Sequence, residues 1–437
     1  MRVKNNITFF VLAFIFTCPV FFLVSPSEGF KLAPSYSSEL TGVLLIPLSY
    51  LVSPLLLFIS VIAYRGFFFS ASAALLGAGI LGCYTISILM GLIFEVPHSG
   101  DVRSFQRYFQ SCIPVVSFFL GVQIIGHEKT LKAQSKRINA FIIYASYLII
   151  GYFLLYFIQT LIGGHGNRFS VVADHIGPFY NPKIKRFYPS FLAIALVVVF
   201  ALSFQRSNKE NNKYTLIASS ILGLLGLLTF WSRTAIFTLV CGFSYVSINM
   251  RFFKTLAIWI VPVVVLLFLY LFNFSEVFIN SFTAVERSYD TLLALLGDNQ
   301  SSNSGDIVRF DRIWFAVNES LRTPFGSGFS LHKQYLFPIP DIAIAENGYL
   351  DVSVRGGVPA LTMLVFILIS AYRRIKYAEI KLGTDMLPAK ALFFSLVFGV
   401  LPWLHMTTEA YFSSFFWLLI GMLCGISNTT NCISKNR

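Results

Sequence analysis

Long apolar runs separated by short polar links organise this chain. Runs of about 20 apolar residues, the length that an α-helix needs to cross a bilayer, recur along the sequence. This pattern predicts an all-α polytopic membrane protein with twelve transmembrane helices. They are expected at 7–24, 40–63, 70–94, 109–126, 139–162, 189–204, 214–231, 234–249, 255–274, 346–371, 391–404 and 411–427.

The runs lie on either side of one long polar segment. Residues 1–274 hold nine of the predicted helices, and residues 346–437 hold the last three and a tail. Residues 275–345 form a single link between them. Connections inside compact domains are usually much shorter, and long ones are commonly functional. The chain is therefore divided into two membrane regions and one large loop.

Two helices are predicted within this loop. Apolar residues recur at helical spacing over 278–296 and again over 310–321. A polar stretch at 297–305 separates them, and Asp306 is suited to cap the second. The first helix is expected to lie along the membrane surface, because its polar residues fall on other faces.

Charge predicts the orientation of the chain. With the N-terminus in the cytoplasm, the links on that side carry 19 of the 33 Lys and Arg residues but only 4 of the 20 Asp and Glu residues. An excess of Lys and Arg marks the cytoplasmic side of a membrane protein. Both termini are therefore expected inside, and residues 275–345 outside.

Composition and motifs exclude several classes of protein. The sequence is 56% hydrophobic and only 12% charged, whereas soluble domains are about 25% charged. It has no phosphate-binding Gly-rich loop and no cytoplasmic link large enough for a nucleotide-binding domain, which excludes ATP-driven chemistry. Neither the six histidines nor the six cysteines show a ligand spacing, and no Asp-x-Asp occurs, so no metal site is expected.

Arginines nevertheless gather on the predicted outer side. Arg309 and Arg312 lie three apart on the second loop helix and share one side of it. Arg233 is held in a tight turn between two apolar runs, and Arg168 and Arg186 belong to the outer link at 163–188. A planar guanidinium binds phosphate through two hydrogen bonds, so this set predicts an anionic substrate. For any single arginine, a surface charge or a lipid-headgroup anchor is the alternative.

Ionisable residues also stand where the large loop re-enters the membrane. Glu346, Asn347 and Asp351 lie at the mouth of the tenth run, where a charge is costly unless it is used or paired. Glu346 is accordingly either a catalytic base or the ion-pair partner of Arg355 or another arginine.

Several short motifs resemble those of a known family. They are Gly177-Pro-Phe-Tyr-Asn181-Pro182, Ser232-Arg233-Thr234, Arg309-x-x-Arg312-x-Trp314, Pro324-Phe-Gly326-Ser-Gly328, Glu346-Asn347-Gly-Tyr-Leu350 and Gly356-Gly357. In these motifs the chain resembles the O-antigen polymerase and O-antigen ligase superfamily of bacterial surface-polysaccharide assembly. Ligase-like members usually carry His-Asn where this chain has Glu346-Asn347, which favours a polymerase.

The resemblance implies a membrane-embedded, GT-C-like glycosyltransferase of the bacterial inner membrane. Such enzymes use no cofactor and no metal, and they polymerise repeat units carried on undecaprenyl diphosphate at the periplasmic face, for O-antigen, capsular polysaccharide or exopolysaccharide. The implied partners are this lipid-linked glycan, membrane lipid, and a flippase and chain-length regulator of the same pathway, but no nucleic acid. The expected catalytic residues are Glu346, Arg309 and Arg312. The expected substrate ligands are Arg233, Arg168, Arg186, Asn181, His332 and Asn347.

Two alternatives share parts of this description. An O-antigen ligase, which transfers the glycan to lipid A core, uses the same donor. A lipid-linked oligosaccharide flippase also has about twelve helices, but its charges should line a cavity within the membrane. In this chain the runs are nearly free of charge and the chemistry-bearing residues lie in the large loop, which favours an enzyme.

Overall fold

Helices make up most of the described part of this protein. The computed structural model describes residues 2–17, 21–25, 29–33, 44–93, 102–162, 180–181, 186–187, 189–203, 233–249, 304–326, 328–329, 347–403 and 410–426. The chain forms two compact units. The first comprises Met1–Leu45, Asn139–Asn303 and Leu382–Val400, and the second comprises Ile46–Ile138, Ser304–Lys381 and Leu401–Arg437.

The described residues include three helical stretches that are long and apolar enough to cross a membrane. These are Ala71–Ile93, Arg107–Gly126 and the stretch that begins with Gly348–Leu382. Shorter apolar helices accompany them at Ile7–Thr17, Leu48–Ala63, Leu192–Leu202, Phe237–Val246 and Ser413–Cys424. The protein is therefore a helical membrane protein, as the apolar runs predict.

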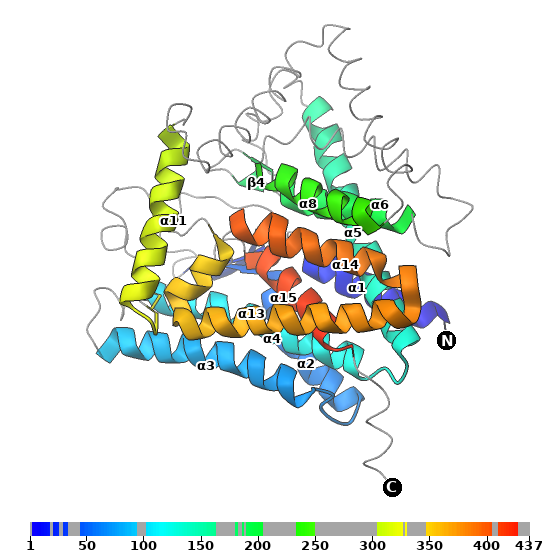
Figure 1. Ribbon diagram of the computed structural model, residues 1–437, viewed down its shortest axis with the longest axis horizontal. Helices are drawn as coiled ribbons and strands as arrows, with labels where there is room; N and C mark the ends of the chain where they lie inside the picture. Colours follow the sequence, from blue (N-terminus) through cyan, green and yellow to red (C-terminus); the bar gives the residue numbers. More distant parts are fainter. Residues whose placement is uncertain are drawn as a thin grey trace, which may run out of the picture. The chain divides into compact units, whose positions relative to one another are not determined.

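The second unit is a helical bundle that carries most of the candidate site. It contains α2 (Leu48–Ala63), α3 (Ala71–Ile93), α4 (Val102–Gly126), α11 (Ser304–Arg322), α13 (Gly348–Leu382) and α15 (Ala410–Cys424). Figure 1 shows α3, α4 and the long part of α13 running alongside one another, while α11 runs crosswise to them. The helix α5 (Leu131–Ile162) begins in this unit and continues in the first.

Glycine allows α4 and α15 to pack closely in the centre of this bundle. A Cβ atom added to Gly121 would overlap the backbone of Leu418, and one added to Gly421 would overlap the backbone of Phe118. Gly421 and Gly425 are spaced by four residues, the small-xxx-small arrangement that brings membrane helices together. Trp417 is buried beside this contact and meets Phe118 edge to face.

A buried glutamine stabilises the turn between α2 and α3. The side chain of Gln123 accepts a hydrogen bond from the backbone N–H of Phe68 at 2.8 Å and donates one to the carbonyl of Gly66 at 2.8 Å. His127 stacks on Tyr64 with ring centroids 3.8 Å apart and meets Phe68 edge to face. Burial lowers the pKa of His127 below its usual value, with Arg137 and Lys129 acting in the same direction and Glu128 against it.

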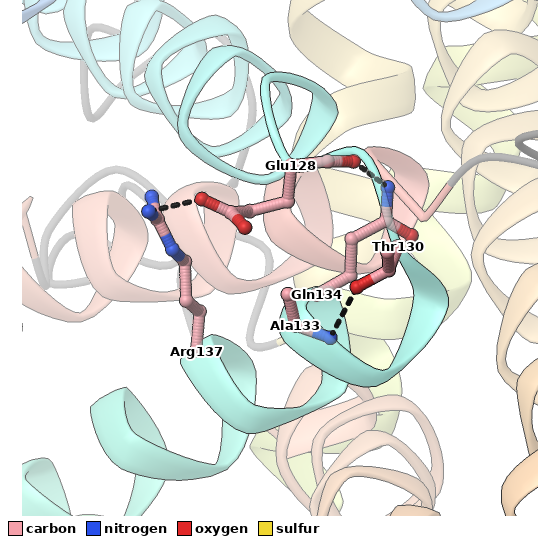
Figure 2. A network of polar contacts seen from close by, with 5 residues as sticks. All are labelled: Glu128, Thr130, Ala133, Gln134 and Arg137. Atoms are coloured by element: carbon pink, nitrogen blue, oxygen red, sulfur yellow. Dashed lines mark hydrogen bonds and ion pairs between the residues drawn. The ribbon is translucent and has the colours of Figure 1, made fainter. Parts of the chain in front are cut away.

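The link from α4 to α5 is held by polar contacts, which Figure 2 shows. Thr130 caps α5, because its hydroxyl accepts a hydrogen bond from the backbone N–H of Ala133 at 3.2 Å. The side chain of Gln134 donates to the carbonyl of Glu128 at 2.9 Å. The carboxylate of Glu128 also forms an ion pair with Arg137. The tight link therefore fixes where α5 starts.

The first unit adds further helices and two small sheets. Its helices are α1 (Arg2–Thr17), α6 (Pro189–Ser203), α8 (Arg233–Asn249), α14 (Leu387–Phe394) and the larger part of α5. A three-stranded sheet has the order β2-β1-β3, where β1 is Phe21–Ser25, β2 is Gly29–Ala33 and β3 is Leu44–Pro47. β4 (Tyr180–Asn181) and β5 (Arg186–Phe187) form an antiparallel pair.

Aromatic stacking joins α8 to α14 within the first unit. Tyr245 stacks on Phe394 with centroids 4.1 Å apart, and the ammonium of the buried Lys390 lies 5.1 Å from the Tyr245 ring. A π-helical turn, Ser395–Val400, follows α14 and packs against Thr238, where Gly399 leaves room for the neighbouring backbone. Such turns are often found at functional positions.

Most of the predicted apolar runs that the structure describes coincide with helices, but the run predicted at 40–63 is helical only from Leu48, because residues 44–47 form the strand β3. The run predicted at 7–24 ends as a helix at Thr17, and residues 21–25 form a strand instead. Pro19 explains the end, because a proline disfavours helical backbone in the residue before it. The predicted runs at 214–231 and 255–274, and the loop helix predicted at 278–296, lie outside the described residues.

Candidate functional site

The helix α11 carries two of the predicted catalytic arginines. It spans Ser304–Arg322 and so begins two residues before the predicted cap at Asp306. Its buried face is formed by Ala316 and Ser320. Positions 309 and 312 fall on this same side of the helix, because residues three, four and seven apart share a face.

The end of α11 is joined to α13 through two glycine motifs. The backbone N–H of Val358 donates to the carbonyl of Pro324 at 2.9 Å. Gly326 has φ of 90°, and a Cβ atom there would lie 2.6 Å from the carbonyl oxygen of Arg355 and 2.5 Å from the Ser87 hydroxyl. The segments Pro324–Gly328 and Gly356–Gly357 therefore touch through their backbones. We call this contact the glycine joint.

The helix α13 is broken at the same place. Gly357 has φ of 79° and ψ of 176°, a conformation that is essentially restricted to glycine. Pro359 lies in the first turn of the longer part of α13, which follows the break. Because proline has no N–H, it leaves no donor unsatisfied in that turn. The break leaves the backbone N–H of Val358 without a carbonyl partner in the helix. This N–H donates instead to the carbonyl of Pro324. The break is thus satisfied by the loop, as a membrane environment requires.

The chain after α11 docks against α3 and α4 through Phe329. Gly328 donates its backbone N–H to the hydroxyl of Ser87 at 3.0 Å. Phe329 is buried and meets Tyr84 and Tyr108 edge to face, with centroids 5.6 and 5.5 Å away. These contacts hold the return of the loop at the same end of the bundle as the glycine joint.

A buried ion pair lies on the short first part of α13. Arg355 donates from Nε to Oδ1 of Asp351 at 2.7 Å, and the two side chains are only 2% and 3% exposed. The guanidinium lies 5.8 Å from the Phe329 ring, and its Nη1 atom has no hydrogen-bond partner among the described residues. The pair therefore links the broken helix to the returning loop.

Asn347 begins α13 as its N-cap. Its side-chain oxygen accepts hydrogen bonds from the backbone N–H groups of Tyr349 at 3.0 Å and Leu350 at 3.1 Å. This is the usual way in which asparagine satisfies the free N–H groups of a first helical turn.

The remaining predicted site residues divide among three locations. Asn181 and Arg186 are direct register partners in the β4–β5 pair. Arg233 is the first residue of α8, and all three belong to the first unit. Arg309, Arg312 and Asn347 belong to the second unit. Glu346, Arg168 and His332 lie outside the described residues.

Sequence reasoning did not single out Tyr84, Ser87, Tyr108 and Phe329. A signal for Tyr84 and Ser87 exists, since their hydroxyl groups interrupt the apolar run predicted at 70–94, whereas Tyr108 lies in the polar link before the next run. Phe329 is one of 47 phenylalanines and carries no comparable signal. For metal binding, no three His, Cys, Asp or Glu side chains come together within the ranges that the structure describes.

Comparison with protein families and with curated proteins gives this site no further support. No protein-family model and no curated protein matches the chain. The motifs and the way they meet in the second unit therefore carry the functional argument.

Proposed function

We propose that this protein is a bacterial inner-membrane glycosyltransferase that polymerises repeat units carried on undecaprenyl diphosphate. In this proposal twelve helices cross the membrane, both termini are cytoplasmic, and the large loop at 275–345 lies in the periplasm. The enzyme takes no nucleotide and no metal, because its donor already carries a diphosphate leaving group. Its products are O-antigen, capsular polysaccharide or exopolysaccharide.

The glycine joint is the observation that best supports this proposal. Two of the motifs that resemble the polymerase and ligase superfamily, Pro324–Gly328 and Gly356–Gly357, contact each other directly although they are far apart in sequence. A contact through backbone atoms needs glycine at these positions, which gives both motifs a physical purpose. It also attaches the helix with Arg309 and Arg312 to the helix that begins at Asn347.

The proposed reaction needs two kinds of group. A hydroxyl of the acceptor sugar attacks the anomeric carbon of the donor sugar, the bond from that carbon to the diphosphate breaks, and undecaprenyl diphosphate leaves with the electron pair. Arg309 and Arg312 neutralise the charge that grows on the diphosphate, and Glu346 receives the hydroxyl proton. Arg233, Arg168, Arg186, Asn181, His332 and Asn347 are the proposed ligands of the glycan and the diphosphate.

The packing of α11 is consistent with this assignment. Positions 309 and 312 fall on the side of α11 on which Ala316 and Ser320 are buried. A donor preorganised in a site that excludes water stabilises a transition-state charge far more than a surface charge does. Removing one such donor typically lowers turnover by about 10²–10³-fold.

Lysine substitutions test the arginines without removing charge. Arg309→Lys and Arg312→Lys keep the cation but lose the planar fork, so each should greatly reduce polymer length in cells while the protein stays in the membrane. Arg322→Lys is the matched control, because Arg322 is exposed in the last turn of the same helix. Polymer of normal length from both site variants would refute the diphosphate clamp.

Deletion of the gene separates the polymerase from its rivals. A polymerase mutant should retain lipid A core that bears a single repeat unit. Bare core with accumulated lipid-linked polymer would instead identify a ligase. Lipid-linked repeat units trapped on the cytoplasmic face would identify a flippase.

A further inference from the structure

The helix α11 presents large apolar side chains away from the protein. Trp314 is 68% exposed, Leu321 is 71% exposed, and Phe325 in the following turn is 55% exposed. Trp314 and Leu321 are seven residues apart and so occupy one side of the helix. We call these three residues the open face of α11.

The opposite side of α11 is its buried side. Ala316 and Ser320 are buried there, and the Ser320 hydroxyl donates to the carbonyl of Ala316 at 2.8 Å. Small residues at a contact let helix backbones approach closely. A helix bathed in water would bury its large apolar residues and expose its small polar ones. In α11 the large apolar Trp314 and Leu321 are exposed while Ala316 and Ser320 are buried, which favours an apolar environment for the open face.

The open face continues the exposed apolar side of α13, part of a stretch long and apolar enough to cross a membrane. On the long part of α13, Val358, Val365, Phe366 and Ile369 are exposed and lie along one side of a membrane-crossing helix. Phe325 lies next to the Val358 end of this row of exposed residues. Its backbone is 2.5 Å from a Cβ built on Gly357, and the carbonyl of the preceding Pro324 accepts a hydrogen bond from the backbone N–H of Val358. The apolar surface therefore runs from α13 through Phe325 onto α11.

The direction of α11 also fits a membrane surface. Figure 1 shows α11 crosswise to α3 and to the long part of α13, near the broken end of α13. A helix in this direction, with tryptophan on its apolar side, has the character of an interfacial helix. Such helices bury their apolar side about 5–10 Å into the boundary between headgroups and acyl chains.

We propose that α11 is an interfacial helix whose open face is embedded in the lipid leaflet at the broken end of α13. The partner is bilayer lipid, and the inference does not depend on the glycosyltransferase activity. One consequence is that positions 309 and 312, on the other side of the helix, lie near the level of the lipid phosphates. The large loop is then held to the membrane along its second helix.

Fluorescence of the full-length protein in vesicles tests this proposal. The protein is reconstituted into phosphatidylcholine–phosphatidylglycerol vesicles, and the emission of Trp314 is obtained by subtracting the spectrum of the Trp314→Phe variant. Lipid brominated on chain carbons near the headgroup should quench this emission strongly, and lipid brominated near the chain end should quench it less. Aqueous acrylamide should have little effect.

A second tryptophan position tests whether the whole open face, and not Trp314 alone, contacts lipid. In the Trp314→Phe background, Leu321→Trp should reproduce the quenching by lipid, whereas Arg322→Trp, at the next and polar position, should be quenched by acrylamide. The proposal would be overturned if acrylamide quenched the emission of Trp314 and the emission of the Leu321→Trp variant. Protection from both quenchers would also overturn it, because another protein surface would then cover the open face.

Discussion

Replacing Gly357 with alanine should separate α11 from α13. A Cβ atom at this position would overlap the carbonyl oxygen of Pro324 and lie 2.5 Å from the carbonyl carbon of Phe325. Both are backbone atoms, so no side-chain rotation can make room. The backbone conformation itself costs alanine roughly 1–3 kcal/mol. Breaking the bond from Val358 to Pro324 where water is scarce costs roughly another 1–3 kcal/mol, so about 2–6 kcal/mol is expected in total.

Two other glycines supply matched controls for this variant. Gly383 also has a positive φ, of 64°, but a Cβ atom there meets nothing within 4 Å, so Gly383→Ala should cost only about 1 kcal/mol of backbone strain. Gly82 lies inside α3 with the same open space, and alanine there should be neutral or slightly stabilising.

Thermal unfolding of the purified protein measures the three variants. The expected order of midpoints is Gly82→Ala at or above the original protein, then Gly383→Ala, then Gly357→Ala. Limited proteolysis should also cut the 275–345 loop fastest in Gly357→Ala. If Gly357→Ala unfolds at the temperature of Gly383→Ala and its loop is equally protected, the glycine joint does not hold α11.

Two further predictions concern charge. Asp351→Asn should lower the free energy of unfolding by roughly 3–5 kcal/mol, because it leaves the Arg355 guanidinium buried without its counter-charge. The double variant Asp351→Leu with Arg355→Met should recover much of this loss. A thermal melt in which Asp351→Asn is as stable as the original protein would contradict this prediction. Burial lowers the pKa of folded His127, so the unfolded chain takes up a proton first as pH falls, and stability should decline below the ordinary value of 6.5. His127→Phe should flatten that part of the stability–pH profile, and an unchanged slope would disprove a role for this ring.

The sequence predicted the helices more fully than their partners. Apolar spacing at 70–94 and 310–321 corresponds to α3 and to most of α11, because a helix fixes which residues share a face. The same spacing does not tell whether protein or lipid covers that face. The exposure of Trp314 was therefore beyond it.

The break in α13 had a signal that the apolar run concealed. The run at 346–371 is apolar enough to predict one continuous helix, yet Gly356-Gly357 followed by Pro359 combines residues that end and start helices. The partner of Arg355 was similarly within reach, since Asp351 precedes it by four residues. The docking of Phe329 between Tyr84 and Tyr108 depends on contacts distant in sequence, which no local pattern encodes.

The close packing of α4 and α15 has a consequence for how the protein is made. Roughly 280 residues separate Gly126 from Ala410, so at about 5–20 residues per second the ribosome needs on the order of 15–60 seconds to synthesise them. During this time the glycine-bearing side of α4 waits in the membrane without its counterpart. A premature stop codon ahead of α15 would leave α3, α11 and α13 synthesised but the bundle that positions them open. Quality-control proteases would then be expected to degrade the truncated protein.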